Sequence, residues 1–293
     1  MTERVHDGSP GIRTAVITSR LGLSRLPSPA RCVMIVIWLL VVLAAIYPRA
    51  YTSLNPYAID PSAILAGPSS RHLLGTDEAG ADIFTRIIYG TRLDAEICLF
   101  GVAIAYAIGV PLGLLAGLRR GVVNEIMTSL TGGILAFPIV LFALLVVGSF
   151  GASAGTLIAI FGFAFFPQVL LMTRAQTMAV YNRGYVLSAR AAGLTNRRII
   201  FVHILHNIMG PLLVLVPQLM ATALLAEAGL SYLGVGVQPP SITWGALLLD
   251  SSNYYHSDPL YAITAGLVIT IVAALLLITG DLISESMDPL RRR

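Results

Sequence analysis

The residue types that carry most enzyme chemistry are scarce in this sequence. All 19 basic residues are Arg, so no lysine can hold phosphates in a P-loop or form a Schiff base. Cys32 and Cys98 lie in apolar runs without a CxxC pair, which disfavours a disulfide framework or a zinc site. His203 and His206 have no further ligands nearby, and no HExxH motif occurs in the sequence. We therefore expect no enzyme activity, no metal and no cofactor bound by this chain.

The composition instead indicates a membrane protein. Of the 293 residues, 56% are hydrophobic and only 12% are charged, against about 25% in ordinary soluble domains. The mean hydropathy is +0.80. A soluble domain of this size needs more polar surface, and a disordered chain needs far fewer apolar residues. The pI near 9.3 reflects Arg residues that flank apolar runs, so we expect no nucleic-acid partner.

Six apolar runs predict an all-α polytopic protein with six transmembrane helices, because only helices satisfy the backbone in lipid at these lengths. The runs are 32–47, 95–118, 126–150, 154–172, 208–237 and 260–282. The first is short, and a cleaved signal peptide is the alternative, although the polar segment 1–31 before it is long for that role. Prolines predict kinks within the later runs, at Pro111, Pro138, Pro167, Pro211 and Pro217.

The distribution of Arg predicts the orientation. Fifteen Arg fall in segment 1–31, residues 119–125, segment 173–207 and the tail 283–293, and four fall in segment 48–94. The positive-inside rule therefore places both termini and segment 173–207 in the cytoplasm. Segment 48–94 is then extracytoplasmic. It begins as a proline-containing loop and ends with a predicted amphipathic helix over 78–92, capped by Thr76 or Asp77.

Polar residues inside the apolar runs are candidates for function. Gln218 and Thr222 are four residues apart and share a helical face, which makes them candidates for a translocation pathway. Polar contacts between helices are the alternative. Glu227 lies nine residues after Gln218 and falls on the opposite face. It is either a structural carboxylate bonded to backbone near Gly229 or 234–236, or a substrate or gating contact.

Two extracytoplasmic groups are candidates for docking a partner or contacting cargo. One is acidic and contains Asp77, Glu78 and Asp82. The other lies in 238–258, which has no Arg, and contains Trp244, Asp250, Tyr254 and Tyr255. Aromatic residues at a membrane interface explain the second group equally well.

Segment 173–207 predicts a helix–turn–helix with its break at 193–196. Residues 185–193 read YVLSARAAG, whose small side chains allow close approach by another surface, and Gly193 permits the turn. On physical grounds alone, an interfacial helix on anionic lipid is an alternative. The segment resembles the EAA loop of ABC importer permeases, although Leu187 replaces the usual Glu and His206 the usual Pro.

Three further motifs resemble the dipeptide and oligopeptide importer permeases of the C-subunit type. They are HLLGTDEAGAD at 72–82, in which Ala81 replaces the usual Arg, LAEAGLSYLGVGVQPP at 225–240 followed by Trp244 and Gly245, and Gly280-Asp281 with Asp288-Pro289. The resemblance covers residue 30 to the C-terminus. The chain is therefore similar to a family of type I, binding-protein-dependent importers, and the resemblance implies a location in the bacterial plasma (inner) membrane.

The resemblance implies a permease fold with a coupling helix over 185–200 and three kinds of protein partner. These are a second related permease, two ATPase subunits that bind ATP and Mg, and an extracytoplasmic substrate-binding protein. The implied coupling residues are Tyr185, Ser188, Ala189, Arg190, Gly193, Arg197 and Arg198. The implied cargo is a di- or oligopeptide, with a nickel complex or a glutathione-like or haem-like solute as alternatives. A stand-alone secondary transporter is the alternative of another class, disfavoured because Glu227 alone is clearly intramembrane.

Overall fold

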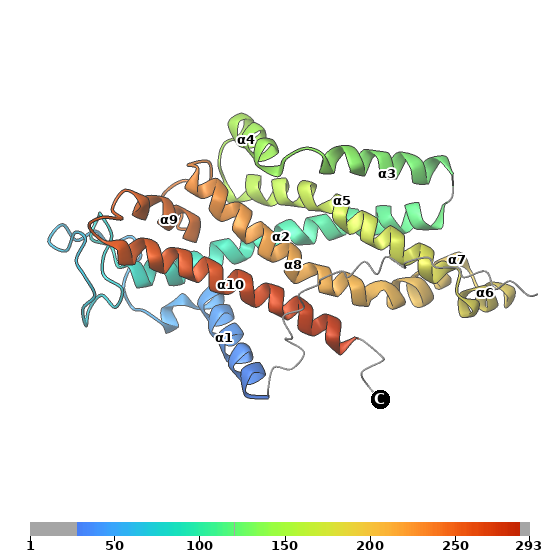
Figure 1. Cartoon of the computed structure of the whole chain (residues 1–293), viewed down its shortest axis with the longest axis horizontal. Coiled ribbons are helices and arrows are strands. Elements are labelled where there is room, and N and C mark those ends of the chain that lie inside the picture. The colour runs from blue at the N-terminus through green and yellow to red at the C-terminus, as the bar shows by residue number, and fades with distance from the viewer. Residues whose placement is uncertain (1–27, 120, 288–293) are drawn as a thin grey trace, which may run out of the picture.

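The chain is a bundle of helices. The computed structural model describes residues 28–119 and 121–287, and the isolated bridge between Thr76 and Asp82 is the one strand-like pairing in those ranges. The bundle is elongated, with α6 and α7 at one end and α9 at the other (Figure 1). We call these the α6 end and the α9 end. The all-α prediction is confirmed, whereas most of segment 1–31, Asp288 and Pro289 lie outside the described residues.

Twelve elements follow one another along the described chain. They are α1 (Ser28–Ile46), the 3-10 turn η2 (Pro48–Ala50), α2 (Ile83–Leu118), α3 (Val122–Leu135), α4 (Ile139–Phe150), α5 (Ala154–Tyr181), α6 (Gly184–Ala191), α7 (Asn196–Arg198), the π-helical η3 (Ile199–Leu205), α8 (His206–Tyr232), α9 (Trp244–Ser252) and α10 (Pro259–Ser286).

The structure supports four or five membrane spans in the described residues. Four helices are long and apolar enough, namely Ile83–Leu118, Ala154–Tyr181, Asn196–Tyr232 and Pro259–Ser286. The pair α3 and α4 passes the same test only as one broken span. The apolar part of α1, Cys32–Ile46, is shorter than the ~20 residues that a crossing needs. The prediction of six spans is therefore not confirmed.

The predicted single span over 126–150 is wrong in shape. Its helix ends at Leu135 and resumes at Ile139, and the two halves are bent by 81°. Pro138 lies at the break with φ of −61°, and its missing N–H and ring prevent the α3 ladder from continuing. The kink that Pro138 predicted is thus a complete break.

The predicted separate helix over 78–92 is also wrong. The helix begins at Ile83 and continues without interruption through the apolar run to Leu118, so α2 has 36 residues. Asp82, rather than Thr76 or Asp77, caps it: the Asp82 Oδ2 accepts a hydrogen bond from the Thr85 N–H at 2.8 Å. α2 consequently extends beyond the apolar run and carries Arg86 and Asp94 into the α9 end.

Close contact between α2 and α5 forms the centre of the bundle. Gly109, Gly113 and Gly117 recur every four residues on the face of α2 that meets α5. A Cβ at any of them would lie 2.6–2.7 Å from backbone or side-chain atoms of α5. The absence of a side chain therefore lets the two backbones approach, as small residues do in membrane helix pairs.

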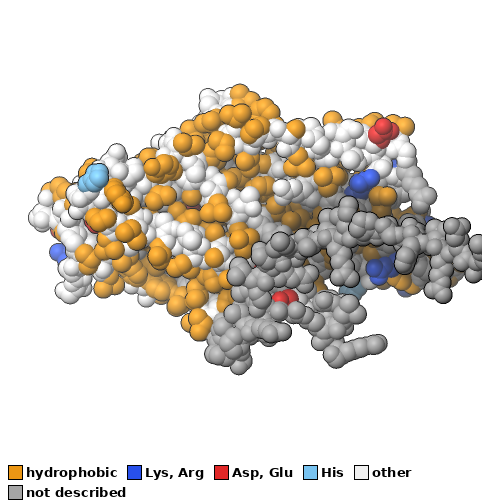
Figure 2. Space-filling model, in the orientation of Figure 1, with side chains coloured by type: hydrophobic (Ala, Val, Ile, Leu, Met, Phe, Trp, Pro, Cys, Tyr) orange, Lys and Arg blue, Asp and Glu red, His pale blue; other side chains and the backbone are white. Residues whose placement is uncertain are grey.

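The flanks of the bundle are apolar. Large hydrophobic side chains remain exposed along α1, α3, α4 and α8, among them Leu39, Leu145 and Leu213. In Figure 2 hydrophobic side chains spread over the length of the visible face, while charged side chains are few and lie mainly toward the two ends. This distribution suits a molecule whose middle faces lipid and whose ends face water.

Candidate functional site

The α6 end presents a short helix and a tight turn. Gly193 has φ of +76°, its N–H donates to the Arg190 carbonyl at 2.9 Å, and the Leu194 N–H donates to the Ala189 carbonyl at 3.1 Å. This pair of bonds ends α6 in the left-handed conformation that favours glycine. The prediction of a helix–turn–helix with Gly193 at its turn is confirmed.

One face of α6 is anchored and the other is free. Val186 is fully buried and packs with Ile199 and Ile204 in an apolar cluster that also touches α2 and α5. The Arg190 guanidinium lies 3.7 Å from the centre of the Tyr181 ring at the end of α5. Exposed side chains occupy the free surface, at Tyr185, Leu187, Ser188, Arg197 and Arg198, with Gly193 at the turn and Ala189 half-buried. The helix is thus a rigid projection from the bundle.

The α9 end is closed by ion pairs. Asp77 is fully buried, and its Oδ1 accepts hydrogen bonds from the Ala79 and Ala81 N–H groups at 2.9 and 2.8 Å. Its Oδ2 binds the Arg86 guanidinium, whose other nitrogen lies 3.7 Å from Asp250 Oδ2. His72 Nδ1 lies 3.0 Å from Asp82 Oδ1. The loop 51–82 is therefore fixed to α2 and α9.

A pocket of about 360 Å³ opens beside this network. Its walls include Glu78, Arg86 and Asp250, together with residues 234–242. Burial raises the pKa of the Glu78 carboxyl above its usual value, and neighbouring Asp77 and Asp250 add to the increase. Burial is also the largest cause that raises the pKa of Asp250, which nearby Arg86 opposes.

Several predicted docking residues are buried, although Asp77 contributes to the wall of the pocket. Asp77, Asp82 and Trp244 are 0%, 5% and 3% exposed, so they do not form the accessible docking surface that the sequence suggested. Each is engaged internally: Asp77 binds backbone N–H groups of its own loop, Asp82 caps α2, and the Trp244 indole donates to the Ile87 carbonyl of α2. Tyr255 is 57% exposed and Tyr254 is half-buried, and neither lines the pocket.

The middle of α8 separates its polar residues by face, as the helical spacing predicted. Thr222 is exposed and Gln218 is half-buried, whereas Glu227 is fully buried. The Thr222 hydroxyl donates to the Gln218 carbonyl at 2.9 Å. The free face of α8 therefore carries Thr222, and the opposite face packs into the bundle with Glu227.

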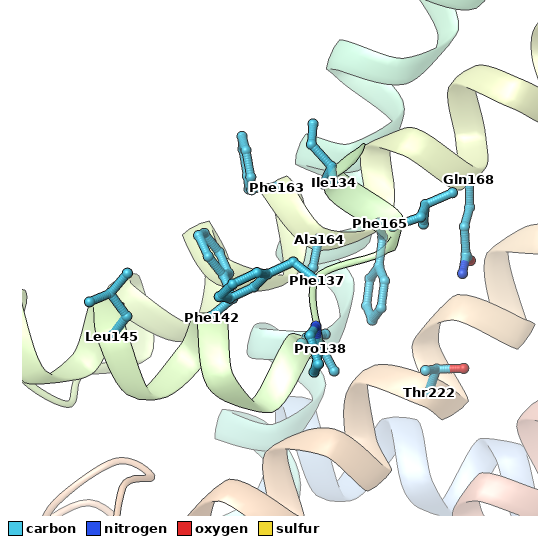
Figure 3. A pocket seen from close by; sticks show the side chains of 12 residues that line it. Ile134, Phe137, Pro138, Phe142, Leu145, Phe163, Ala164, Phe165, Gln168 and Thr222 are labelled. Atoms are coloured by element: carbon cyan, nitrogen blue, oxygen red, sulfur yellow. The ribbon is translucent and has the colours of Figure 1, made fainter. Parts of the chain in front are cut away.

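A second pocket, of about 470 Å³, lies at the break between α3 and α4. Figure 3 shows its aromatic side chains gathered around Pro138, with Gln168 of α5 and Thr222 of α8 on one side. The apolar lining consists of Ile134, Leu135, Phe137, Pro138, Ile139, Phe142, Leu145, Phe163, Ala164 and Phe165. A mostly apolar wall with a few polar groups is typical of binding pockets for small molecules.

The sequence analysis missed Asp94, a buried carboxyl group that interacts with Glu227. The two carboxyl groups interact electrostatically, and Asp94 is 1% exposed. The predicted span began at residue 95, so Asp94 was assigned to a solvated segment. A predicted span that began several residues before 95 would have included Asp94. The Glu96 side chain, in contrast, is 43% exposed and pairs with Arg92 at 2.9 Å.

A family model and individual relatives place the chain in the same protein family. The model for the "binding-protein-dependent transport system inner membrane component" matches residues 109–293. The dipeptide transport system permease protein of Alkalihalophilus pseudofirmus is 34% identical over 248 residues, which cover 85% of this chain and 82% of that protein. The glutathione transport system permease protein of Pectobacterium atrosepticum is 33% identical over 223 residues, which cover 76% and 74%.

The fold agrees with a solved transporter. The structure of the MetNI methionine ABC transporter in inward-facing conformations matches with a TM-score of 0.56 at 16% identity, over 70% of this chain and 96% of the matched chain. At that identity the likeness shows the fold alone. Since the family model covers more than half of the sequence and the relatives match along most of it, the chain belongs to the binding-protein-dependent inner membrane components, the permeases of type I ABC importers.

Proposed function

We propose that this permease imports di- or oligopeptides and forms half of the pathway, with a second related permease forming the other half. The proposal on cargo is supported by relatives described as dipeptide and di/tripeptide permeases, each at least 33% identical over most of the chain. One relative is described as a glutathione permease, and glutathione is itself a small peptide. Other small solutes carried by the same machinery are the second candidate.

The proposed topology places the α6 end in the cytoplasm and the α9 end outside. Arg183, Arg190, Arg197 and Arg198 surround α6, in keeping with the positive-inside rule. At the α9 end the charges are mainly acidic, and Arg86 is neutralised by Asp77 and Asp250. The C-terminus is then cytoplasmic, and the proposal that the N-terminus is cytoplasmic as well requires α1 to be a sixth crossing.

The observation that carries the proposed mechanism is the two-sided construction of α6. Val186 fixes the helix to the bundle through a fully buried contact, and Tyr185, Leu187 and Ser188 remain free for a partner. A cytoplasmic ATPase subunit that binds this free surface would move the bundle as a rigid body when the ATPase subunits close around ATP and Mg. Leu187 then supplies an apolar contact where related loops carry a charge.

The pathway is proposed to run along the free face of α8. Thr222 and Gln168 supply hydrogen-bonding groups beside the aromatic pocket, and such groups suit a peptide backbone next to an apolar side chain. Gln218 continues this face by one turn. At the α9 end, Asp250, Tyr254 and Tyr255 are proposed contacts for the substrate-binding protein.

The test is purification of the tagged chain in mild detergent, with the subunits counted by mass spectrometry and transport assayed after reconstitution. We expect one related permease and two ATPase copies, and ATP-dependent uptake that requires a binding protein. Competition among dipeptides, longer peptides and glutathione then defines the cargo. Uptake by the chain reconstituted alone would contradict the proposal and favour a secondary transporter.

A further inference from the structure

Two buried carboxyl groups flank the beginning of α9. Asp94 of α2 is 1% exposed and Glu227 of α8 is 0% exposed. The Asp94 Oδ2 accepts a hydrogen bond from the Trp244 N–H, the first residue of α9, at 3.0 Å. The Ser231 hydroxyl donates to Glu227 Oε1 at 2.7 Å, and the hydroxyl of Thr243, the N-cap of α9, also interacts with the Glu227 carboxyl. The two acids thus meet at one helix terminus.

Each carboxyl group retains one oxygen without a hydrogen-bond partner. These atoms are Asp94 Oδ1 and Glu227 Oε2, and both are fully buried. A buried polar atom of this kind is costly unless something binds it. No group of three or more His, Cys, Asp and Glu side chains that could hold a metal ion occurs within residues 28–119 and 121–287. A proton is the smallest ligand that satisfies two such oxygens at once.

The local charges favour one negative charge, not two. The N-terminus of α9 presents backbone N–H groups and the positive end of its dipole, which stabilise a single carboxylate. Among the described residues, the other groups that interact with the pair are the Ser231 and Thr243 hydroxyls and the Cys98 thiol, none of which is a cation. Two adjacent ionised carboxylates would repel each other here without compensation.

We propose that Asp94 and Glu227 share one proton and, as a singly charged pair, position α9 against α2 and α8. Glu227 Oε2 carries the proton toward Asp94 Oδ1, which leaves Asp94 as the acceptor for the Trp244 N–H. We call this group, Asp94, Glu227, Ser231, Thr243 and Trp244, the carboxyl clasp. Asp94 and Glu227 act as positioning residues within it.

The surroundings of the carboxyl clasp are built for close packing. A Cβ at Gly245 would lie 2.7 Å from Ala228 Cα and Ser231 Cβ, so glycine is required for α9 to approach α8 at this point. The Trp244 indole N–H donates to the Ile87 carbonyl of α2 at 2.9 Å. At the other end of α9, Asp250 faces Arg86 of α2. The clasp therefore holds one end of α9 and the Arg86 pair holds the other, and between them they position the wall of the 360 Å³ pocket.

The protonation state is tested by infrared spectroscopy of the purified permease complex. The spectrum of Glu227→Gln is subtracted from that of the parent near neutral pH, in normal and heavy water. We expect a protonated carboxylic acid C=O band in the parent that shifts in heavy water and disappears in the variant. A difference spectrum that contains carboxylate bands alone would overturn the shared proton.

The positioning role is tested by thiol labelling of the same complex in nanodiscs. The background is Cys32→Ser with Cys98→Ala, and the reporter is Ser251→Cys, since Ser251 is fully buried in α9. The neighbouring exposed position, Ser252→Cys, gives the intrinsic rate of reaction with a water-soluble maleimide. We expect the reporter to react at least about tenfold more slowly than this control, a margin of ~1.4 kcal/mol in local opening.

Variants of Glu227 then decide the role of the pair. Glu227→Gln keeps the shape and supplies an N–H in place of the shared proton, so the reporter stays protected. Glu227→Ala removes the contact, and labelling rises toward the rate of the control position. The proposal would be contradicted if the reporter reacted equally fast in the Gln and Ala variants, or if it stayed protected in both. Glu96→Gln changes a carboxylate that is 43% exposed on α2, the helix of Asp94, and it serves as the matched control that leaves labelling unchanged. These measurements require no cargo, so they are independent of the proposed function.

Discussion

The two ends of the bundle hold their shapes by different means. At the α6 end, the backbone fixes the local structure: Gly193 in the left-handed conformation and two backbone hydrogen bonds form the turn. One buried side chain, Val186, packs the helix against the bundle. At the α9 end, buried side chains dominate. Asp77 alone binds two backbone N–H groups and the Arg86 guanidinium, and the carboxyl clasp binds the start of α9.

The difference suits two kinds of task. A projection that another subunit grips needs free side chains on a rigid backbone, because its contacts are made with the partner. An end that holds loops and α9 over a pocket has to satisfy its polar groups internally, because buried charges without partners are costly. We therefore expect substitutions at the α9 end to reduce stability, and substitutions at the α6 end to reduce coupling without loss of stability.

Asp77→Ala is expected to have the largest effect. It removes two backbone caps and leaves Arg86, only 17% exposed, with the distant Asp250 as its remaining partner. Breaking a buried ion pair typically costs about 3–5 kcal/mol, so the melting temperature of the detergent-solubilised complex falls strongly. Glu96→Ala, which removes an exposed pair with Arg92, changes stability by less than ~1 kcal/mol. Similar small shifts in both variants would refute the contrast between buried and exposed pairs.

Gly193→Val tests the α6 end. A β-branched residue at φ of +76° is strained by about 1–3 kcal/mol, whereas asparagine tolerates this conformation. A Cβ at this position meets no atom within 4 Å, so steric conflict with the bundle is not involved. We expect Gly193→Val to insert and assemble but to disconnect ATP hydrolysis from uptake, and Gly193→Asn to retain coupling. The introduction of a charge by Gly193→Asp is expected to disconnect them as well.

Coupling is measured as binding-protein-stimulated ATPase activity and uptake in the same vesicles. Fully coupled transport in Gly193→Val would rule out the coupling role of the turn. A loss of assembly in Gly193→Asn would show instead that the turn has a stabilising role that the backbone geometry alone does not explain.

Local patterns predicted the features that depend on neighbouring residues. Apolar runs predicted the long helices, and Gly193 predicted the turn. The spacing of Thr222 and Glu227 predicted that they lie on opposite faces of the helix. Features that depend on residues distant in the chain were missed. Asp94 and Glu227 are 133 positions apart. The helical pattern over 78–92 and the apolar run after it do not show that the two form one continuous helix that buries Asp94.

The break at Pro138 shows the same limit in another form. The proline predicted a kink, but a bend of 81° depends on what the two halves pack against. Here Phe142 of α4 stacks on Phe163 of α5, with ring centres 5.2 Å apart. Such a contact is tertiary, so the sequence of 126–150 could not distinguish a kinked span from a broken one.

Thr222→Trp tests the pocket at that break and is expected to act on transport alone. Thr222 is exposed at the edge of a 470 Å³ cavity, and an indole there occupies the space without displacing buried atoms. We expect uptake to fall about tenfold, equivalent to ~1.4 kcal/mol in the barrier, with unchanged melting temperature. Thr222→Ser keeps the hydroxyl and retains uptake. Normal transport through the Trp variant would place the pathway elsewhere.

Glu78→Gln is the smallest and most specific test of the α9 end. Burial raises the pKa of this carboxyl in the folded protein above its ordinary value of 4.5, so folding favours the protonated form. Stability that depends on this group is therefore present below pH 4.5 and is lost as the pH rises through the folded pKa. The amide cannot ionise. The variant should therefore have the same melting temperature as the parent at or below pH 4.5, and a higher melting temperature than the parent at neutral pH. For Glu96→Gln, at a side chain that is 43% exposed, the difference in melting temperature from the parent should not increase with pH in this way. If the melting temperature of Glu78→Gln instead fell relative to that of the parent as the pH rises, Arg86 would stabilise the ionised Glu78 more than burial penalises it. The acidic residues of the α9 end would then be stabilised by ion pairs alone.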